Sequence, residues 1–277
     1  MGLARFRRRM AVKMNSPLFS INNFVFYYPD TKTPSIDFLK SNLVIPRGKK
    51  TFILGPSGCG KTTLLQILGL LRDAPLSTST ITMDGIQDYS KLSSNDKTAI
   101  RGKNFGFILQ SFYLLPNFRV LENIAMPLIL NGMHRRNACD LVREVIKDSG
   151  LCGSDENDLN QVLDHTSDKL SQGQKQRVAI LRALIHKPQV IFADELTSNL
   201  DPSTTRKTFE LLNRWQGEED NRSIIMITHD IQTAIRHADY FVVMDSNHHL
   251  AMEFTKEEYS QNEEKLIKIM GLENTNA

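Results

Sequence analysis

The segment Gly55–Thr63, with the sequence GPSGCGKTT, constrains this chain more than any other segment. An apolar run at Thr51–Leu54, which predicts a strand, precedes it, and a helical pattern over Thr62–Leu71 follows it. The form G-x-x-x-x-G-K-[ST] between a strand and a helix is typical of a phosphate-binding loop. Glycines let successive backbone N–H groups point inward, and the helix adds the positive end of its dipole. The segment therefore predicts a polyphosphate site rather than a simple glycine-rich turn.

The side chains of this loop have separate expected roles. Lys61 would reach the β- and γ-phosphates as a point charge, and the Thr62 hydroxyl would take one position on Mg²⁺. Cys59 lies at a helix N-terminus beside a lysine, and both features favour a reactive thiolate. The equal alternative is that Cys59 is only a small residue that fills space in the loop. The predicted contacts to ATP in this loop are Gly55, Pro56, Ser57, Gly58, Cys59, Gly60, Lys61, Thr62 and Thr63.

A second apolar run, Val190–Ala193, predicts a buried parallel strand and ends in two acidic residues. Asp194 is placed to hold magnesium through water. Glu195 lies one residue further on, where a carboxylate can polarise the water that attacks the γ-phosphate. A helix cap is the alternative role for this acidic pair. Beside a phosphate loop, the pair favours ATP hydrolysis.

Six motifs in a fixed order, over about residues 18–245, resemble those of the ATP-binding-cassette (ABC) ATPases. LSQGQ at Leu170–Gln174 resembles the signature sequence, FILQS the glutamine loop, TSNLD the D-loop and MITHD the segment of the switch histidine. The resemblance implies catalytic roles for Glu195, His229 and Gln110, and magnesium ligation by Thr62, Gln110 and Asp194. It also implies ATP contacts from Tyr28, which matches the adenine-stacking aromatic residue, and from Ser171, Gly173, Gln174 and Asp201.

The same resemblance implies that the phosphate loop of one subunit faces the signature sequence of another. The signature opens a predicted helix at Gln174–Ile185, so the chain would pair with a second copy of itself or with a related cassette. Two positions depart from the family pattern. Gln172 replaces a glycine and Leu196 replaces a proline. Neither change removes a hydrogen-bond donor to ATP or the base Glu195. We therefore expect them to alter the rate of hydrolysis and the affinity for ATP rather than to abolish activity.

Alternating strand and helix patterns predict an α/β fold: a parallel-sheet core of the P-loop NTPase (RecA-like) type, an antiparallel β portion and an inserted α-helical subdomain. Helical spacing is found at Val120–Asn131 and Asn137–Ser149.

We expect a basic tail at 1–17, an ATPase domain at 18–255 with its helical subdomain at about 111–170, and a C-terminal helix and polar tail at 256–277. Cys152–Lys169 is polar and predicts an exposed loop. The predicted strands are Ile21–Tyr27, Thr51–Leu54, Ile81–Asp84, Phe105–Ile108, Val190–Phe192, Ile224–Ile227 and Phe241–Met244.

Composition and charge exclude several other classes of protein. A net charge of +3 is too small to favour a nucleic-acid partner. No apolar run is long enough to span a bilayer, and the basic start lacks the apolar core of a secretory signal. That start, with Arg5 and Arg7–Arg9, predicts a solvated tail, with a membrane-surface or nucleic-acid contact as the alternative. The three cysteines have no metal-binding spacing and suit a reducing cytosol.

The segment FGFILQSFYLLPNFRVLENIAMPLIL resembles the ABC subgroup that serves lipoprotein release, macrolide export and cell division. This resemblance implies a peripheral subunit on the cytoplasmic face of the inner or plasma membrane, which drives membrane-embedded permease subunits. The alternatives are an importer or conventional exporter subunit, a soluble ABC protein of translation or DNA repair, and a regulatory nucleotide binder that does not hydrolyse ATP. The last would lack Glu195 or His229. The apolar side chains proposed to meet the permease, unless all of them are core, are Phe112, Tyr113, Leu114, Leu115 and Phe118.

Overall fold

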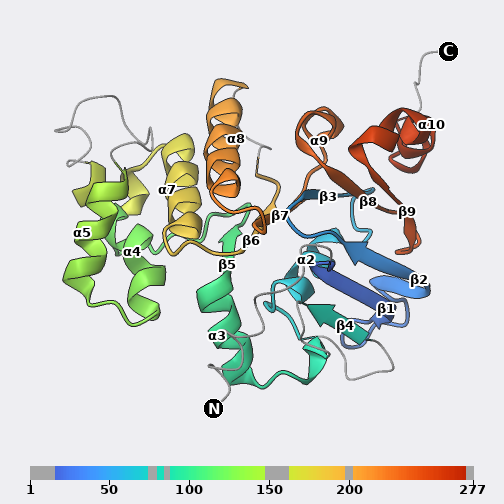
Figure 1. Ribbon diagram of the computed structural model, residues 1–277, viewed down its shortest axis with the longest axis horizontal. Helices are drawn as coiled ribbons and strands as arrows, with labels where there is room; N and C mark the ends of the chain where they lie inside the picture. The colour runs from blue at the N-terminus through green and yellow to red at the C-terminus, as the bar shows by residue number, and fades with distance from the viewer. Residues whose placement is uncertain (1–15, 74–79, 84–87, 147–161, 197–201, 273–277) are drawn as a thin grey trace. The chain divides into compact units, whose positions relative to one another are not determined.

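The computed structural model describes residues 16–73, 80–83, 88–146, 162–196 and 202–272 of the 277 (Figure 1). The chain forms two compact units. The first unit consists of residues 1–97 and 223–277, and the second of residues 98–222. Within the described residues, none of the helices has both the length and the apolar run that crossing a membrane requires.

A three-stranded antiparallel sheet forms one part of the first unit. Its order is β2 (Ile36–Ile45), β1 (Phe19–Phe26) and β4 (Thr80–Met83). Along β1, Phe19, Ile21 and Phe24 are fully buried. The register against β2 shifts between Asn22 and Phe24, and Asn23 has a φ of 50°. Phe24 lies three residues after Ile21, so in a regular strand the two side chains would point to opposite faces. The bulge adds one residue and places both on the buried face.

The other sheet strands of the first unit follow the order β7 (Ser223–Ile227), β3 (Lys50–Leu54), β8 (Tyr240–Met244) and β9 (Leu250–Thr255). β3 is parallel to both of its neighbours, and β9 is antiparallel to β8. The interiors of β3, β7 and β8 are buried, as expected of parallel strands covered on both faces. Helices α2 (Lys61–Leu68), α9 (Ile231–His237) and α10 (Tyr259–Ile269) belong to the same unit.

The second unit combines a parallel strand pair with a group of helices. β5 (Phe105–Ile108) pairs with β6 (Val190–Asp194). The helices are α4 (Val120–Leu130), α5 (Arg135–Val145), α7 (Gln172–Leu184) and α8 (Pro202–Gly217), which lie side by side in Figure 1. Helix α3 (Ser94–Asn104) leads into β5. An aliphatic core with Ile124, Val142 and Val178 at its centre joins α4, α5 and α7.

Each of the seven predicted strands is present in its described residues, within a few residues of the expected bounds. The structure adds β2, β9 and the helices α3, α8 and α9. The prediction of an exposed loop at 152–169 is only partly right for its described end, where Asp164, Asp168 and Lys169 are exposed but two other residues are buried. There Leu163 is 1% exposed and packs into the core of the helices, and Ser167 is buried. Residues 152–161 of that loop, residues 1–15 of the basic tail and residues 273–277 of the polar C-terminal tail lie outside the described part of the chain.

Candidate functional site

The phosphate loop leaves the carboxyl end of β3 and turns through three glycines with positive φ. Gly55 has a φ of 151° and Gly60 a φ of 102°. A Cβ atom on Gly55 would lie 2.4 Å from the carbonyl oxygen of Met244, and one on Gly60 would lie 2.1 Å from that of Ser35. Both positions therefore exclude a side chain by backbone conformation and by space. The loop can close against the neighbouring strands only with glycine at these two positions.

Lys61 is the first residue of α2, and its side chain turns back into the loop. The residue is 5% exposed. Its Nζ donates to the carbonyl oxygens of Gly55 at 2.8 Å and Pro56 at 2.7 Å. An ammonium group held among carbonyls at a helix N-terminus is a strong electrostatic site for an anion. The loop thus has the donor set that a polyphosphate requires.

Cys59 is buried, with 1% of its surface exposed. Burial raises the pKa of its thiol above the usual value, and the nearby Lys61 ammonium opposes this effect only in part. Lys61 Nζ lies 3.8 Å from Cys59 Sγ. Desolvation thus outweighs the lysine, and burial favours the second of the two alternatives, a filler residue under the loop.

Tyr28 lies just after β1 and is tied to the end of the phosphate loop. Its hydroxyl forms a hydrogen bond of 2.9 Å with Oγ1 of the buried Thr63. The Arg72 guanidinium lies 4.7 Å from the centroid of the Tyr28 ring, and Phe26 packs edge-on at 5.3 Å. Arg72 Nε donates a hydrogen bond of 3.0 Å to Gln66 Oε1, which holds the guanidinium in place. The aromatic ring predicted to stack on adenine is thus fixed in place. The contact with Arg72 was not predicted.

His229 lies at the same edge of the first unit's parallel strands as the phosphate loop. β7 and β3 are neighbours in parallel register, with Ile227 opposite Ile53. His229 follows Ile227 by two residues, and Gly55 follows Ile53 by two. The histidine is exposed and precedes Asp230, which caps α9 by accepting a hydrogen bond from the Thr233 amide. The first unit therefore brings together the phosphate loop and the predicted switch histidine.

The acidic pair lies in the second unit, at the carboxyl end of β6. Asp194 is the last residue of that strand, and Glu195 has a φ of 51°, which is rare for a residue with a side chain. Gln110 follows β5, the parallel neighbour, and its Nε2 donates to Glu195 Oε2 at 2.8 Å. Strained backbone at an acidic strand end is common at functional sites. The structure thus joins two of the three predicted catalytic residues.

The signature segment forms the start of α7. Ser171 caps the helix, with its Oγ accepting from the Gln174 amide at 3.3 Å, and the Gln174 side chain accepts from the Ser171 amide at 2.9 Å. This capping box begins the helix at Gln172, two residues before the predicted start. A Cβ on Gly173 would meet nothing within 4 Å. The segment therefore presents an open surface.

Two residues that the sequence did not single out connect α7 to the other motifs of the second unit. Gln176 is buried and donates from Nε2 to the carbonyl of Leu196, just past the acidic pair. Arg182 donates to the carbonyls of Phe112 and Tyr113, both of which have positive φ. Burial lowers the pKa of the Arg182 guanidinium. The spacing of residues along α7 does not predict these two hydrogen-bonding roles, because the backbone carbonyls that accept the bonds lie far away in the sequence.

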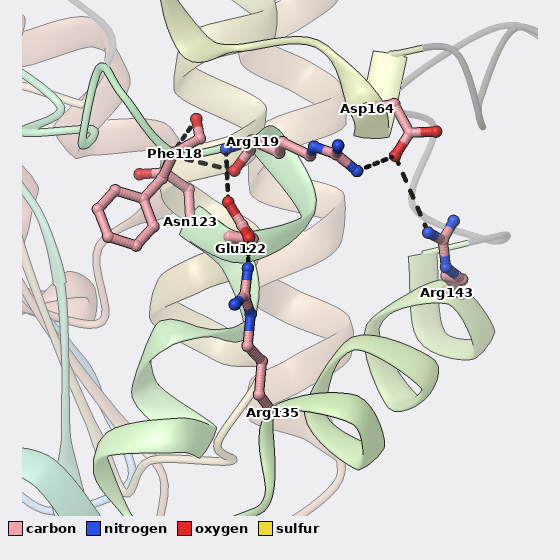
Figure 2. A network of polar contacts seen from close by, with 7 residues as sticks. All are labelled: Phe118, Arg119, Glu122, Asn123, Arg135, Arg143 and Asp164. Carbon is pink, nitrogen blue, oxygen red and sulfur yellow. Dashed lines mark hydrogen bonds and ion pairs between the residues drawn. The ribbon is translucent and has the colours of Figure 1, made fainter.

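The segment after Gln110 is held by a buried asparagine. Asn123 Oδ1 accepts from the Leu115 amide at 2.8 Å, and its Nδ2 donates to the carbonyls of Leu115, Phe118 and Arg119. Figure 2 shows the contacts of Asn123 with Phe118 and Arg119, and also the ion pair between Arg119 and Asp164, whose atoms are 3.4 Å apart. Tyr113 is 65% exposed, Leu115 39% and Phe118 39%. A rigid backbone therefore presents exposed apolar side chains to solvent.

The side chains predicted to hold magnesium are oxygen ligands, which is the chemistry that Mg²⁺ requires. The described residues contain no cluster of three or more His, Cys, Asp or Glu side chains that could hold an ion. Mg²⁺ commonly binds through one or two protein oxygens together with substrate phosphates and water. Thr62, at the start of α2 in the first unit, and Asp194, at the end of β6 in the second unit, each carry an oxygen of the kind that Mg²⁺ prefers. Asp201 and the D-loop at Thr197–Asp201 lie outside the described residues.

The chain is similar to curated ATP-binding proteins over most of its length. The lipoprotein-releasing system ATP-binding protein LolD of Bordetella pertussis is 42% identical over 195 residues, which cover 70% of this chain and 79% of that protein. LolD of Wigglesworthia glossinidia brevipalpis is 38% identical over 220 residues, which cover 79% and 91% of the two chains. Among solved structures, the dimeric ATP-binding cassette MJ0796 in a post-hydrolysis state with ADP and Pi matches with a TM-score of 0.73 and 30% identity, over 86% of this chain and 98% of that chain.

The match to a solved cassette confirms the predicted fold class, an α/β P-loop core with both parallel and antiparallel strands. The family model described as ABC transporter matches residues 38–198, which contain the phosphate loop, Gln110, the signature and the acidic pair. On this evidence the chain belongs to the ABC transporter family, as one of its ATP-binding cassettes.

Proposed function

We propose that the chain hydrolyses ATP as the cassette of a lipoprotein-releasing type of transporter, acting as a dimer on membrane-embedded permease subunits at the cytoplasmic face of the inner membrane. The observation that carries the ATPase assignment is the phosphate loop, with Lys61 buried among its carbonyls at the N-terminus of α2. The similarity to LolD supports the transporter type. The exposed apolar segment after Gln110 supports a docked partner.

ATP binding divides between an aromatic contact and the phosphate loop. Adenine would stack on Tyr28, whose ring is fixed by Arg72 and by the hydrogen bond to Thr63. The loop amides and the dipole of α2 would hold the phosphates, and Lys61 would exchange its two carbonyl partners for phosphate oxygens. Mg²⁺, held by Thr62, Gln110 and Asp194, would neutralise charge on the phosphates.

Hydrolysis needs a base for one water molecule. The water oxygen bonds to the γ-phosphorus, the bond from that phosphorus to the β,γ-bridging oxygen breaks, and ADP and inorganic phosphate leave. Glu195 would take the proton of the attacking water and then release it to solvent. The hydrogen bond from Gln110 to Glu195 orients the carboxylate, and His229 would hydrogen-bond the γ-phosphate and report its loss.

The signature supports a role between two subunits. Ser171 and the Gly173 amide lie at the first turn of α7, where the helix dipole favours an anion. The described part of the chain contains one phosphate loop and one signature segment. A second copy or a related cassette would therefore complete each ATP site.

Docking of the permease can be tested with a charge reversal on the apolar segment. The Arg119 side chain is 60% exposed and ion-paired with Asp164, and Arg143 on α5 lies 4.0 Å from the same carboxylate (Figure 2). Arg119→Glu should leave basal ATPase nearly unchanged and reduce both assembly with the membrane subunits and stimulation by them. The measurement is a pull-down with paired ATPase assays on the separate and assembled proteins.

Arg143→Glu is the matched control, because it disturbs the same Asp164 from a helix outside the apolar segment. It should assemble normally. If Arg119→Glu abolishes basal activity together with folding, the segment is core. If both variants assemble and respond like the wild type, the docking surface lies elsewhere.

A further inference from the structure

A cavity of about 230 Å³ lies within the second unit, among α4, α5, α7 and α8. None of the residues that form the predicted ATP site lines it. Most of its lining is aliphatic, including Val142, Val145, Leu184 and Leu211. Val145 is 50% exposed, so part of this apolar surface faces solvent. The volume is below the ~300–1,000 Å³ typical of drug-sized ligands, so a narrow alkyl chain fits it better than a large ring system.

The Trp215 ring on α8 forms part of the cavity wall, and the residue is 5% exposed. Its Nε1 has no hydrogen-bond partner among the described residues and less than 1 Å² of accessible surface, so an oxygen in the cavity does not reach it. Trp215 therefore contributes an aromatic wall, and the polar contacts of a ligand must come from the charged residues of the lining.

The charged residues that line the cavity favour an anion. Lys187 and Arg214 both line it, and both are exposed. Neither forms an ion pair with a described residue. Glu218 is the one acidic residue of the lining, and Arg222 pairs with it at 2.7 Å. Arg222 also pairs with Glu219 at 2.9 Å, so Glu218 shares this guanidinium with a second carboxylate. Lys187 and Arg214 remain available to a ligand.

We propose that this cavity binds a single-chain aliphatic carboxylate, with the alkyl chain among the aliphatic side chains beside the Trp215 ring and the carboxylate between Arg214 and Lys187. The site is independent of ATP binding and of the proposed function. It joins an apolar wall, a single tryptophan ring and two cations within one compact unit. A neutral alcohol of the same chain length would fill the cavity without using the cations.

Trp215 is the only tryptophan of the chain, so its fluorescence reports on this cavity alone. Decanoate, added to the full chain below the concentration at which it forms micelles, should change the Trp215 emission in a saturable way. Bromodecanoate should quench it. Saturation should raise the unfolding temperature by roughly 3 °C, whereas a detergent effect would lower it. Each methylene added to the ligand should tighten binding about fourfold until the cavity is full.

Arg214→Glu and Lys187→Glu should each weaken decanoate binding about threefold or more and leave 1-decanol binding unchanged. Both positions are exposed, so both variants should fold. Arg206→Glu, on the same helix but outside the cavity lining, is the matched control and should bind like the wild type. The proposal is wrong if decanoate leaves both emission and unfolding temperature unchanged, or if decanol binds as tightly as decanoate. If the Trp215 emission changes with protein concentration in the absence of decanoate, a second copy of the chain covers the cavity, and the proposal is also wrong.

Discussion

The phosphate loop and the signature segment are both glycine-containing turns at helix N-termini, but their glycines are constrained in different ways. A Cβ on Gly60 would clash with the Ser35 carbonyl, whereas one on Gly173 would meet nothing within 4 Å. Gln172, at the family's other signature glycine, is exposed at the first position of α7. The loop is therefore constrained by its own chain. The signature segment is open to solvent, and any constraint on it must come from a partner.

The largest expected difference is between two alanine substitutions. Gly60→Ala places a side chain at a φ of 102° and 2.1 Å from a carbonyl oxygen, so it should abolish ATP binding and destabilise the protein by about 3 kcal/mol or more. Gly173→Ala should fold and bind ATP as a monomer, with any loss confined to dimer formation. Thermal unfolding and nucleotide binding measure both. Equal losses of monomer ATP binding in the two variants would contradict the comparison.

A smaller effect is expected from Arg182, which joins the signature helix to the segment after Gln110. Arg182→Met leaves the carbonyls of Phe112 and Tyr113 without this donor, which should cost about 1–3 kcal/mol of stability and lower ATP turnover. Chemical denaturation and steady-state ATPase assays measure the two effects. Arg136→Met, on the exposed part of α5, is the control. Wild-type stability and turnover in Arg182→Met would show that the link between these segments is unimportant.

The smallest effect concerns the inside of the phosphate loop. Because burial raises the pKa of the Cys59 thiol, less of it is thiolate at neutral pH than in an exposed cysteine. Maleimide should therefore label Cys59 slowly, and the rate should rise as the pH increases beyond the usual thiol range. MgATP should protect Cys59 and preserve activity. Mass spectrometry can locate the adduct. Rapid labelling at neutral pH, or labelling that nucleotide does not affect, would argue against a buried thiol under the bound phosphates.

The strands that the sequence predicted best are those with the simplest surroundings. β3, β7 and β8 are buried on both faces and appear as continuous apolar runs. β2 was missed because its middle, around Lys40–Asn42, is polar and mostly exposed. Its pairing with β1 defines it as a strand. Pairing with β8 likewise defines β9. Local pattern is a weak guide where long-range pairing decides the structure.

Among the site residues, too, those with a local sequence pattern were predicted, and those defined by long-range contacts were not. Short motifs identified Lys61, Glu195 and Gln110, because their chemistry requires fixed residue types at fixed spacings. Arg72 and Asn123 were not identified, because an arginine over a tyrosine ring and an asparagine that binds four backbone groups leave no local pattern. The sequence left a reactive thiol and a filler residue as equal alternatives for Cys59, because it shows the neighbouring lysine but does not show the burial that favours the filler.

The most direct test of the central claim replaces the proposed base. Glu195→Gln keeps the side-chain size and removes the carboxylate that would accept the proton of the attacking water. The variant should bind ATP normally, its turnover should fall by roughly 10²-fold or more, and it should elute as an ATP-bound dimer in size-exclusion chromatography. Wild-type turnover in this variant, or a monomer with ATP under conditions in which the wild type forms a dimer, would contradict the account.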